Sequence, residues 1–407
     1  MNLITLILSI AIGFGLTDFL TERYPRLQRE IFYIAWFVIT FLFTIKYYYG
    51  ADIWHYVNFY KDIQAPGYVW AHPDEIPQNF EIGYALFCSI LKSWGVSFYW
   101  HTVIISVFYF IVIAALFSRI PRKRTFALAI LVVLDYNCIF ATYRQNLAIS
   151  FFILMVLFLQ DKRYFWACVM AVLTAFFHKS GAFVVAIVLF YYMMRSEWVR
   201  PYMYQLLMMV LLVVFLMPIS QIASSLVPLL PLPATYVESI HHHLLLGRQV
   251  QAVFLLYAAA LIVVMHYTQY RPSRMGAIAA AVIVGLVFVV IMYQYYYLLG
   301  RIRSYFLPLV IMYAFSTVQR AEDEKIHVPY GALIKQLSCV VIFFYLIHFV
   351  YMFDCNARLH KHKIYTSCTV FDLIDHRAGE VQNAQMKQAR LWWEEDFMKH
   401  ENNVISQ

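Results

Sequence analysis

The stretch FYWHTVIISVFYFIVIAALFSRIPRKR, residues 98–124, decides the fold class of this chain. Residues 98–118 form one continuous, predominantly apolar run, long enough for a helix to cross the roughly 30 Å hydrocarbon core of a bilayer. The basic cluster Arg119–Arg124 follows at once, and basic residues beside a span favour the cytoplasmic side. We therefore predict a membrane span whose C-terminal end faces the cytoplasm.

The composition of the whole chain agrees with this prediction. Of 407 residues, 62% are hydrophobic and only 13% are charged, whereas a soluble domain is about one-quarter charged. The net charge of +8 is explained by basic loops that orient the chain, so no nucleic-acid partner is predicted. The six cysteines include no CxxC pair, which argues against zinc, iron–sulfur and thioredoxin-like chemistry.

Similar apolar runs predict about twelve spans of roughly 20 residues each. They lie near residues 3–20, 31–49, 98–118, 125–142, 145–160, 164–178, 180–194, 202–217, 251–269, 275–298, 304–319 and 330–353. The predicted fold is an all-α polytopic membrane protein with a transmembrane domain (1–353) and a polar C-terminal tail (354–407). The span count places this tail outside, but Arg358, Lys361 and Lys363 favour the cytoplasm, so its side stays open.

The basic loops place residues 50–97 and the loop 218–250 on the outer side. The segment EIGYALFCSILKSWG (81–95) is too short to span, and its polar residues share one helical face. This pattern is typical of a helix that lies in the membrane interface. DIWHYVNFYKDI, near residues 52–64, shows the same alternation. We therefore predict two interfacial helices in the first outer loop.

Five groups of polar residues fall on the predicted outer face. Their basic members are unexpected there, because basic residues beside spans favour the cytoplasmic side. The five groups are Asp52 with His55 and Tyr56; Glu81; Arg144 with Gln145; His178 with Lys179; and Arg301 with Arg303. Ionisable residues in or beside spans are functional hypotheses by default. The competing explanations are ordinary ones: cations that reach the headgroups, a carboxylate that caps a helix, and a histidine in a satisfied polar contact.

These residue types suit glycosyl transfer from a lipid pyrophosphate. The planar fork of Arg matches phosphate oxygens, and a carboxylate such as Asp52 or Glu81 can accept the proton of an attacking sugar hydroxyl. His178 could carry a proton or contact phosphate. The run His241–His243 does not predict a metal site, because adjacent histidines do not share one face of a helix or strand.

Several of these motifs occur in the order found in one known family. The sequence resembles the EpsG family of Wzy-like polysaccharide polymerases over residues from about 45 to 310. The matching features are GADIWHYVNFYKD (50–62), Glu81-x-Gly83-Tyr84, YRQNLAISFF (143–152), LTAFFHKSGAFV (173–184) and Arg301-x-Arg303-x-Tyr305.

The resemblance implies an enzyme of the bacterial inner membrane with a C-class glycosyltransferase-like fold. Such enzymes join undecaprenyl-pyrophosphate-linked repeat units into O-antigen, capsule or exopolysaccharide at the outer face. It implies that Asp52 is the preferred base, Glu81 the second candidate, and His178 a catalytic or phosphate-facing group. It assigns substrate binding to Arg144, Arg301, Arg303, Tyr56, Gln145 and Lys179.

The implied partners are the lipid-linked donor and acceptor, membrane lipid and a chain-length regulator protein, without a metal or other cofactor. Two alternative functions stay open. An O-antigen ligase uses the same donor but typically has a larger outer loop than residues 218–250. A flippase or transporter would have charges along a path through the membrane and usually internal repeat symmetry.

Overall fold

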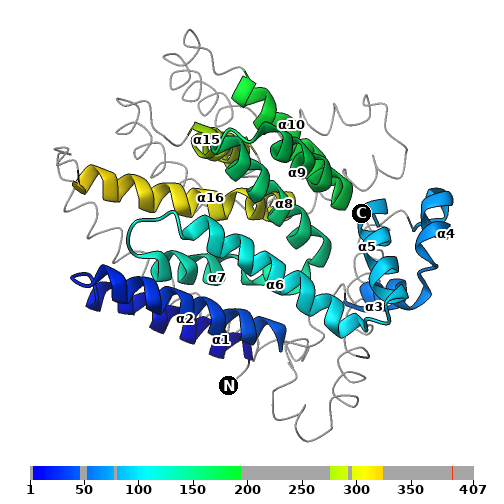
Figure 1. The fold of residues 1–407 in the computed structure, drawn as a ribbon, viewed down its shortest axis with the longest axis horizontal. Coiled ribbons are helices and arrows are strands. Elements are labelled where there is room, and N and C mark those ends of the chain that lie inside the picture. The colour runs from blue at the N-terminus through cyan, green and yellow to red at the C-terminus, as the bar shows by residue number, and fades with distance from the viewer. Residues whose placement is uncertain are drawn as a thin grey trace, which may run out of the picture. The chain divides into compact units, whose positions relative to one another are not determined.

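A computed structural model of the chain describes residues 3–45, 53–77, 80–193, 276–291, 296–323 and Lys387. Within these ranges every long regular element is an α-helix and none is a strand (Figure 1). Three of the described helices are long and apolar enough to cross a membrane, namely Pro25–Thr44, Phe98–Phe117 and Tyr143–Gln160. The chain is a helical membrane protein, as its composition predicts.

Several predictions from the sequence fall outside the described residues. They are the candidate base Asp52, the spans near 202–217, 251–269 and 330–353, the loop 218–250, and the tail apart from Lys387. The total of about twelve spans and the side of the tail therefore stay predictions.

The chain divides into two compact units, and each is described by itself. Unit 1 comprises Met1–Ser150, Phe176–Lys179 and His327–Gln407, and unit 2 comprises Phe151–Ala175 and Ser180–Ile326. The boundary passes through helix α8 (Tyr143–Gln160) and beside the junction of α9 (Tyr164–Phe177) with α10 (Lys179–Met193).

Unit 1 is built on four long helices that pack side by side: α1 (Leu3–Leu20), α2 (Pro25–Thr44), α6 (Phe98–Phe117) and α7 (Arg124–Ala141) (Figure 1). Helix α2 begins six residues before the span predicted at 31–49. Its first residue is Pro25, and proline suits this position because the first helical N–H needs no intrahelical partner. Hydrophobicity alone therefore missed the polar first turns of this helix.

Asp18, buried in α1, links three of these helices. Its Oδ2 accepts a hydrogen bond from the backbone N–H of Phe126 at 2.8 Å, in the first turn of α7. Its backbone carbonyl accepts a second bond from Gln28 Nε2 of α2 at 2.7 Å. Asp18 thus satisfies a helix N-terminus from a neighbouring helix, where the helix dipole favours a negative charge.

The segment between α2 and α6 folds into short helices: α3 (Ile53–Asp62), α4 (Pro66–Ala71), the 3₁₀ turn η1 (Pro73–Glu75) and α5 (Ile82–Ser93). The twelve residues of α5 extend about 18 Å, well short of a bilayer crossing.

Helix α5 buries the face that contains its polar groups, apart from those of its last turn, such as Lys92. Tyr84 and Cys88 are fully buried, whereas Ile90 and Trp94 are 37% and 75% exposed. An exposed apolar face is what a helix at the membrane surface requires. The length and the exposed face agree with an interfacial helix, and its place at the interface stays a prediction.

Polar contacts fix α5 against the end of α3. Lys92 Nζ donates to the backbone carbonyls of Lys61 and, at 2.8 Å, of Ile63, and a cation is favourable at a helix C-terminus. Tyr60 donates its hydroxyl to the carbonyl of Val96 at 2.7 Å. Burial raises the pKa of Tyr60 to about 12, so this hydroxyl stays protonated and the bond persists near neutral pH.

Unit 2 contains α15 (Gly276–Ile291) and α16 (Tyr296–Asp323), which pack against each other. A Cβ at Gly285 would lie 2.6 Å from the ring of Phe306, so glycine permits this close approach. Helix α16 begins eight residues before the span predicted at 304–319, so Arg301 and Arg303 belong to its first turns.

We expect Asp18→Ala to lower the midpoint of thermal unfolding by roughly 2–4 °C, because the first turn of α7 loses its acceptor. Asp18→Asn retains a side-chain oxygen and should lose less. Fluorescence-detected size-exclusion chromatography of heated, detergent-solubilised protein measures both. Glu30→Ala, which removes an exposed carboxylate of α2, is the matched control and should leave the midpoint unchanged. An equal loss for Glu30→Ala and Asp18→Ala would contradict the capping role.

Candidate functional site

The predicted functional residues that the structure brings together lie at the N-terminal ends of three helices and within a fourth, α3. Glu81 is the residue immediately before α5, Tyr56 lies in α3, Arg144 is the second residue of α8, and Lys179 is the first of α10. All four belong to unit 1. Two helix N-termini, those of α8 and α10, therefore contribute to one cluster.

The centre of the cluster is an ion pair between Arg144 and Glu81. The distance from Arg144 Nη1 to Glu81 Oε2 is 2.7 Å, and the two side chains are only 17% and 8% exposed. Charges withdrawn from water need a close partner, and removal of one partner from a buried pair typically costs about 3–5 kcal/mol. Each residue therefore depends strongly on the other.

The second carboxylate oxygen of Glu81 is also occupied. Oε1 accepts a hydrogen bond from the backbone N–H of Lys179 at 3.1 Å, at the first residue of α10. Glu81 thus satisfies one of the donors that every helix N-terminus leaves unpaired, while it holds Arg144 with the other oxygen. Both carboxylate oxygens would have to give up or share a donor before Glu81 could accept a proton from substrate.

Aromatic rings surround the guanidinium of Arg144. Its Cζ lies 4.8 Å from the centre of the Phe80 ring and 5.6 Å from that of Tyr56. Arg144 Nε also donates to the hydroxyl of Tyr56 at 3.3 Å. Cation–π contacts strengthen when water is excluded, so these rings orient the guanidinium as well as screening it.

Gly83 explains how α5 approaches the α9–α10 junction so closely. A Cβ at this position would overlap the backbone of Phe176, with the carbonyl carbon of that residue 2.8 Å away. Only glycine leaves room for this contact. The Glu81-x-Gly83 motif therefore combines a polar contact to Lys179 with a steric requirement two residues later.

The other predicted residues of unit 1 flank the ion pair. Gln145 follows Arg144 in α8 and is buried, and His178 is the half-buried residue that joins α9 to α10. Lys179 contributes its backbone N–H to Glu81, while its side chain is exposed.

The predicted residues of α16 belong to unit 2. Arg303 is partly buried, and the side chain of Arg301 is not among those described. In the same unit Ser180 donates its hydroxyl to that of Tyr305 at 3.2 Å. This bond ties the first turn of α10 to α16, two residues beyond Arg303.

Sequence reasoning missed Phe80. This residue lies against Arg144, and its ring also stacks on Phe59 with centroids 3.9 Å apart and planes 10° apart. Its position directly before Glu81 was a usable signal, because an aromatic residue adjacent to a functional carboxylate is well placed to cover the partner of that carboxylate.

The cluster is chemically suited to an anion. Glu81 contributes one negative charge, Arg144 and Lys179 contribute two positive charges, and the N-termini of α8 and α10 add the positive ends of two helix dipoles. Among the described residues, no group of three or more His, Cys, Asp or Glu side chains could hold a metal ion.

Comparison with known proteins identifies the family. A family model described as the EpsG family matches residues 30–365. The chain belongs to the EpsG family. No curated protein and no solved structure matches it. Membership places the chain among membrane proteins of polysaccharide biosynthesis with a polymerase-like, glycosyltransferase-like role. The matched range of the EpsG family includes every residue of the Glu81–Arg144 cluster.

We expect Arg144→Ala and Glu81→Ala each to lower the free energy of unfolding by about 3 kcal/mol, because each leaves a buried charge without its partner. The double variant should lose less than the sum of the two, with a coupling energy of about 1–3 kcal/mol. The unfolding of the unmodified protein, both single variants and the double variant in mixed micelles is followed by tryptophan fluorescence. The four free energies of unfolding give the coupling energy of this double-mutant cycle.

The control cycle uses the ion pair of Lys123 and Glu22, whose atoms lie 3.5 Å apart and whose side chains are 11% and 51% exposed respectively. A longer ion pair with one partner in solvent should show a coupling of less than about 1 kcal/mol. Equal coupling energies in the two cycles would contradict the prediction that burial strengthens the Arg144–Glu81 interaction.

Proposed function

We propose that this EpsG-family protein polymerises undecaprenyl-pyrophosphate-linked oligosaccharide repeat units into O-antigen, capsule or exopolysaccharide. The reaction takes place at the outer face of the bacterial inner membrane, in a multi-pass fold of about twelve spans related to the C-class glycosyltransferases. The two short helices α3 and α5 lie at the water–lipid boundary, where the lipid-linked sugars are.

The observation that carries this proposal is the oriented guanidinium of Arg144. Glu81 Oε2, the Tyr56 hydroxyl and the Phe80 ring hold it in one position beside two helix N-termini. A guanidinium fixed in advance can stabilise charge that develops on a leaving pyrophosphate without reorganisation during the reaction.

The proposed reaction is a single glycosyl transfer. A hydroxyl of the acceptor sugar attacks the anomeric carbon of the donor glycan, and the bond from that carbon to the pyrophosphate oxygen breaks. The hydroxyl proton passes to a carboxylate, for which Asp52 is the preferred candidate. Undecaprenyl pyrophosphate leaves with the bonding electrons, and Arg144, with Arg301 and Arg303, binds its negative charge.

The hydrogen bonds of Glu81 favour a positioning role over that of base. In this proposal Glu81 orients Arg144 and supports the start of α10, so that His178 and Lys179 face the substrate. Tyr56 orients Arg144 from the opposite side, and Gln145 contributes to substrate binding from α8.

Arg144→Ala and His178→Ala should each reduce long-chain surface polysaccharide to single repeat units. Arg144→Ala removes the cation that binds the leaving pyrophosphate, and His178→Ala removes a group that carries a proton or contacts phosphate. Arg144→Lys should also lose at least tenfold in long-chain product, since an ammonium cannot reproduce the planar fork. Gel analysis of surface glycan from a deletion strain that carries each variant measures this.

Arg163→Ala, which removes an exposed Arg between α8 and α9, is the control and should give full-length chains. Membrane levels of each variant are compared by immunoblot. Full-length chains from both Arg144→Ala and His178→Ala would refute the site, and loss of all surface repeats in the deletion strain would favour a flippase.

Helix α5 should place both of its ends on the same side of the membrane, because twelve residues cannot cross the bilayer. Single cysteines introduced at Gln64 and Trp94, both exposed, should react equally with a membrane-impermeant maleimide added to spheroplasts. A cysteine at Arg163 should react only after permeabilisation. Protection of the Trp94 position alone would show that the segment crosses.

A further inference from the structure

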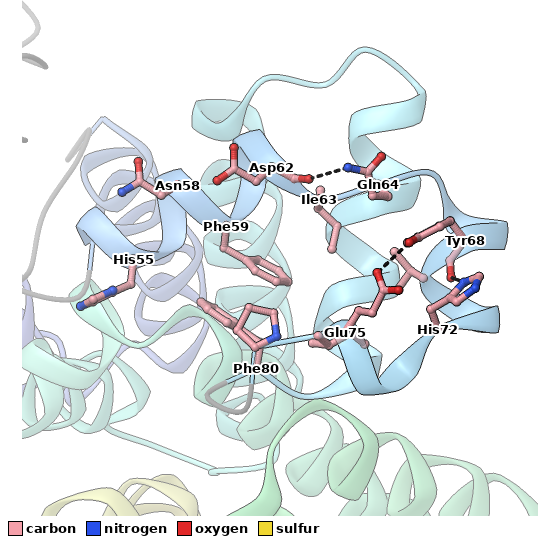
Figure 2. Close-up of a pocket in the computed structure, with 13 residues that line it drawn as sticks. His55, Asn58, Phe59, Asp62, Ile63, Gln64, Tyr68, His72, Glu75 and Phe80 are labelled. Atoms are coloured by element: carbon pink, nitrogen blue, oxygen red, sulfur yellow. Dashed lines mark hydrogen bonds between the residues drawn. The ribbon is translucent and has the colours of Figure 1, made fainter.

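A cavity of about 470 Å³ lies beside the Arg144–Glu81 cluster, within unit 1. Its walls come from α3, the linker to α4, α4 itself, and His72, Glu75, Ile76, Pro77 and Phe80 (Figure 2). Of its lining residues, the sequence singles out His55 but neither of the two carboxylates. Its volume is within the range of small-molecule sites, about 300–1,000 Å³.

The charge of this cavity is opposite to that of the cluster. Its charged lining residues are Asp62 and Glu75, and none of the described residues that line it is Lys or Arg. A phosphate or pyrophosphate would meet two carboxylates here with no Lys or Arg to offset them, the other ionisable nitrogen groups being the imidazoles of His55 and His72, and this is unfavourable for an anion. The ligand class that fits is neutral, or carries an amino group.

The other residues that line the cavity include both polar and apolar side chains. Asn58, Gln64 and Tyr68 supply amide and hydroxyl hydrogen-bonding groups, while Phe59 and Ile63 supply apolar surface. A sugar ring has the matching character, with hydroxyl groups at its edge and C–H bonds on its faces. Carboxylates suit such a ligand because each can accept bonds from several hydroxyls.

Two contacts hold the wall of the cavity in place. Tyr68 donates its hydroxyl to Glu75 Oε2 at 2.6 Å, and its ring stacks on that of His72 with centroids 4.3 Å apart. Figure 2 shows this bond joining Tyr68 of α4 to Glu75 of η1. Tyr68 is also 43% exposed, so its ring is accessible to a ligand entering from solvent.

Phe80 connects the cavity to the proposed site. The same ring that lines the cavity stacks on Phe59 and lies against the guanidinium of Arg144. A ligand in the cavity is therefore separated from Arg144 by one aromatic ring. The geometry brings an acidic, hydroxyl-binding compartment next to an anion-binding one.

We propose that this cavity binds a neutral or amino-substituted sugar residue of the repeat unit while Arg144 faces the pyrophosphate. This inference rests on the proposed polymerase function and adds a substrate class: repeat units whose bound sugar carries no carboxylate or phosphate.

The test uses the full-length protein in detergent. The probe is the repeat-unit oligosaccharide released from its lipid by mild acid, which carries neither lipid nor phosphate. Saturation-transfer difference NMR should detect binding to the unmodified protein. Asp62→Asn with Glu75→Gln should weaken binding at least tenfold, and Tyr68→Phe should weaken it several-fold. Asp74→Asn, an exposed neighbour in η1 that does not line the cavity, is the matched control and should bind normally.

Inorganic pyrophosphate should not compete with the oligosaccharide, and Arg144→Ala should still bind it. Absence of binding to the unmodified protein, unchanged binding in the Asp62→Asn, Glu75→Gln double variant, or competition by pyrophosphate would each overturn the inference. The varied side chains Asp62, Tyr68 and Glu75 are exposed, so size-exclusion profiles should remain unchanged.

Surface-glycan gels separate this inference from the proposed function. Shorter chains in the Asp62→Asn, Glu75→Gln variant, together with single repeats in Arg144→Ala, support both. Full-length chains in the cavity variant with single repeats in Arg144→Ala overturn the sugar site alone. Full-length chains in Arg144→Ala overturn the polymerase site, whatever the NMR result for the oligosaccharide.

Discussion

The buried pair of Arg144 and Glu81 is the interaction on which this region of the molecule depends. Its partners are 63 residues apart in the chain, and the same carboxylate reaches the start of α10. Because neither charge is stable in a buried position alone, the position of Glu81 beside Arg144 and Lys179 and the orientation of the guanidinium are a single requirement. Local structure and function are coupled here through one carboxylate.

Two different chemical environments, a cationic cluster and an acidic cavity, lie next to each other in unit 1. The guanidinium and the helix N-termini favour an anion, whereas the cavity lined by Asp62 and Glu75 repels one. Phe80 lies between them and contacts both. A lipid-linked sugar has the same polarity along its length, from a charged pyrophosphate to an uncharged ring. The arrangement therefore selects the orientation of a substrate as well as its presence.

The sequence predicts most of the described helices, because continuous apolar runs and basic loops are strong local signals. It also predicts that residues 81–95 form a short helix with one exposed apolar face. It could not predict that Glu81 would pair with Arg144, since periodicity within a segment says nothing about partners in another. Likewise, the early start of α2 at Pro25 reflects the placement of a proline, which hydropathy does not record.

Asp18 has a consequence for how the protein is made. Its partner, the N–H of Phe126, is 108 residues later in the chain, so α1 is synthesised long before its carboxylate can be satisfied. Until Phe126 has been made, the carboxylate near the C-terminal end of α1 lacks this hydrogen bond. The contact between α1 and α7 can therefore be completed only after α7 has been synthesised.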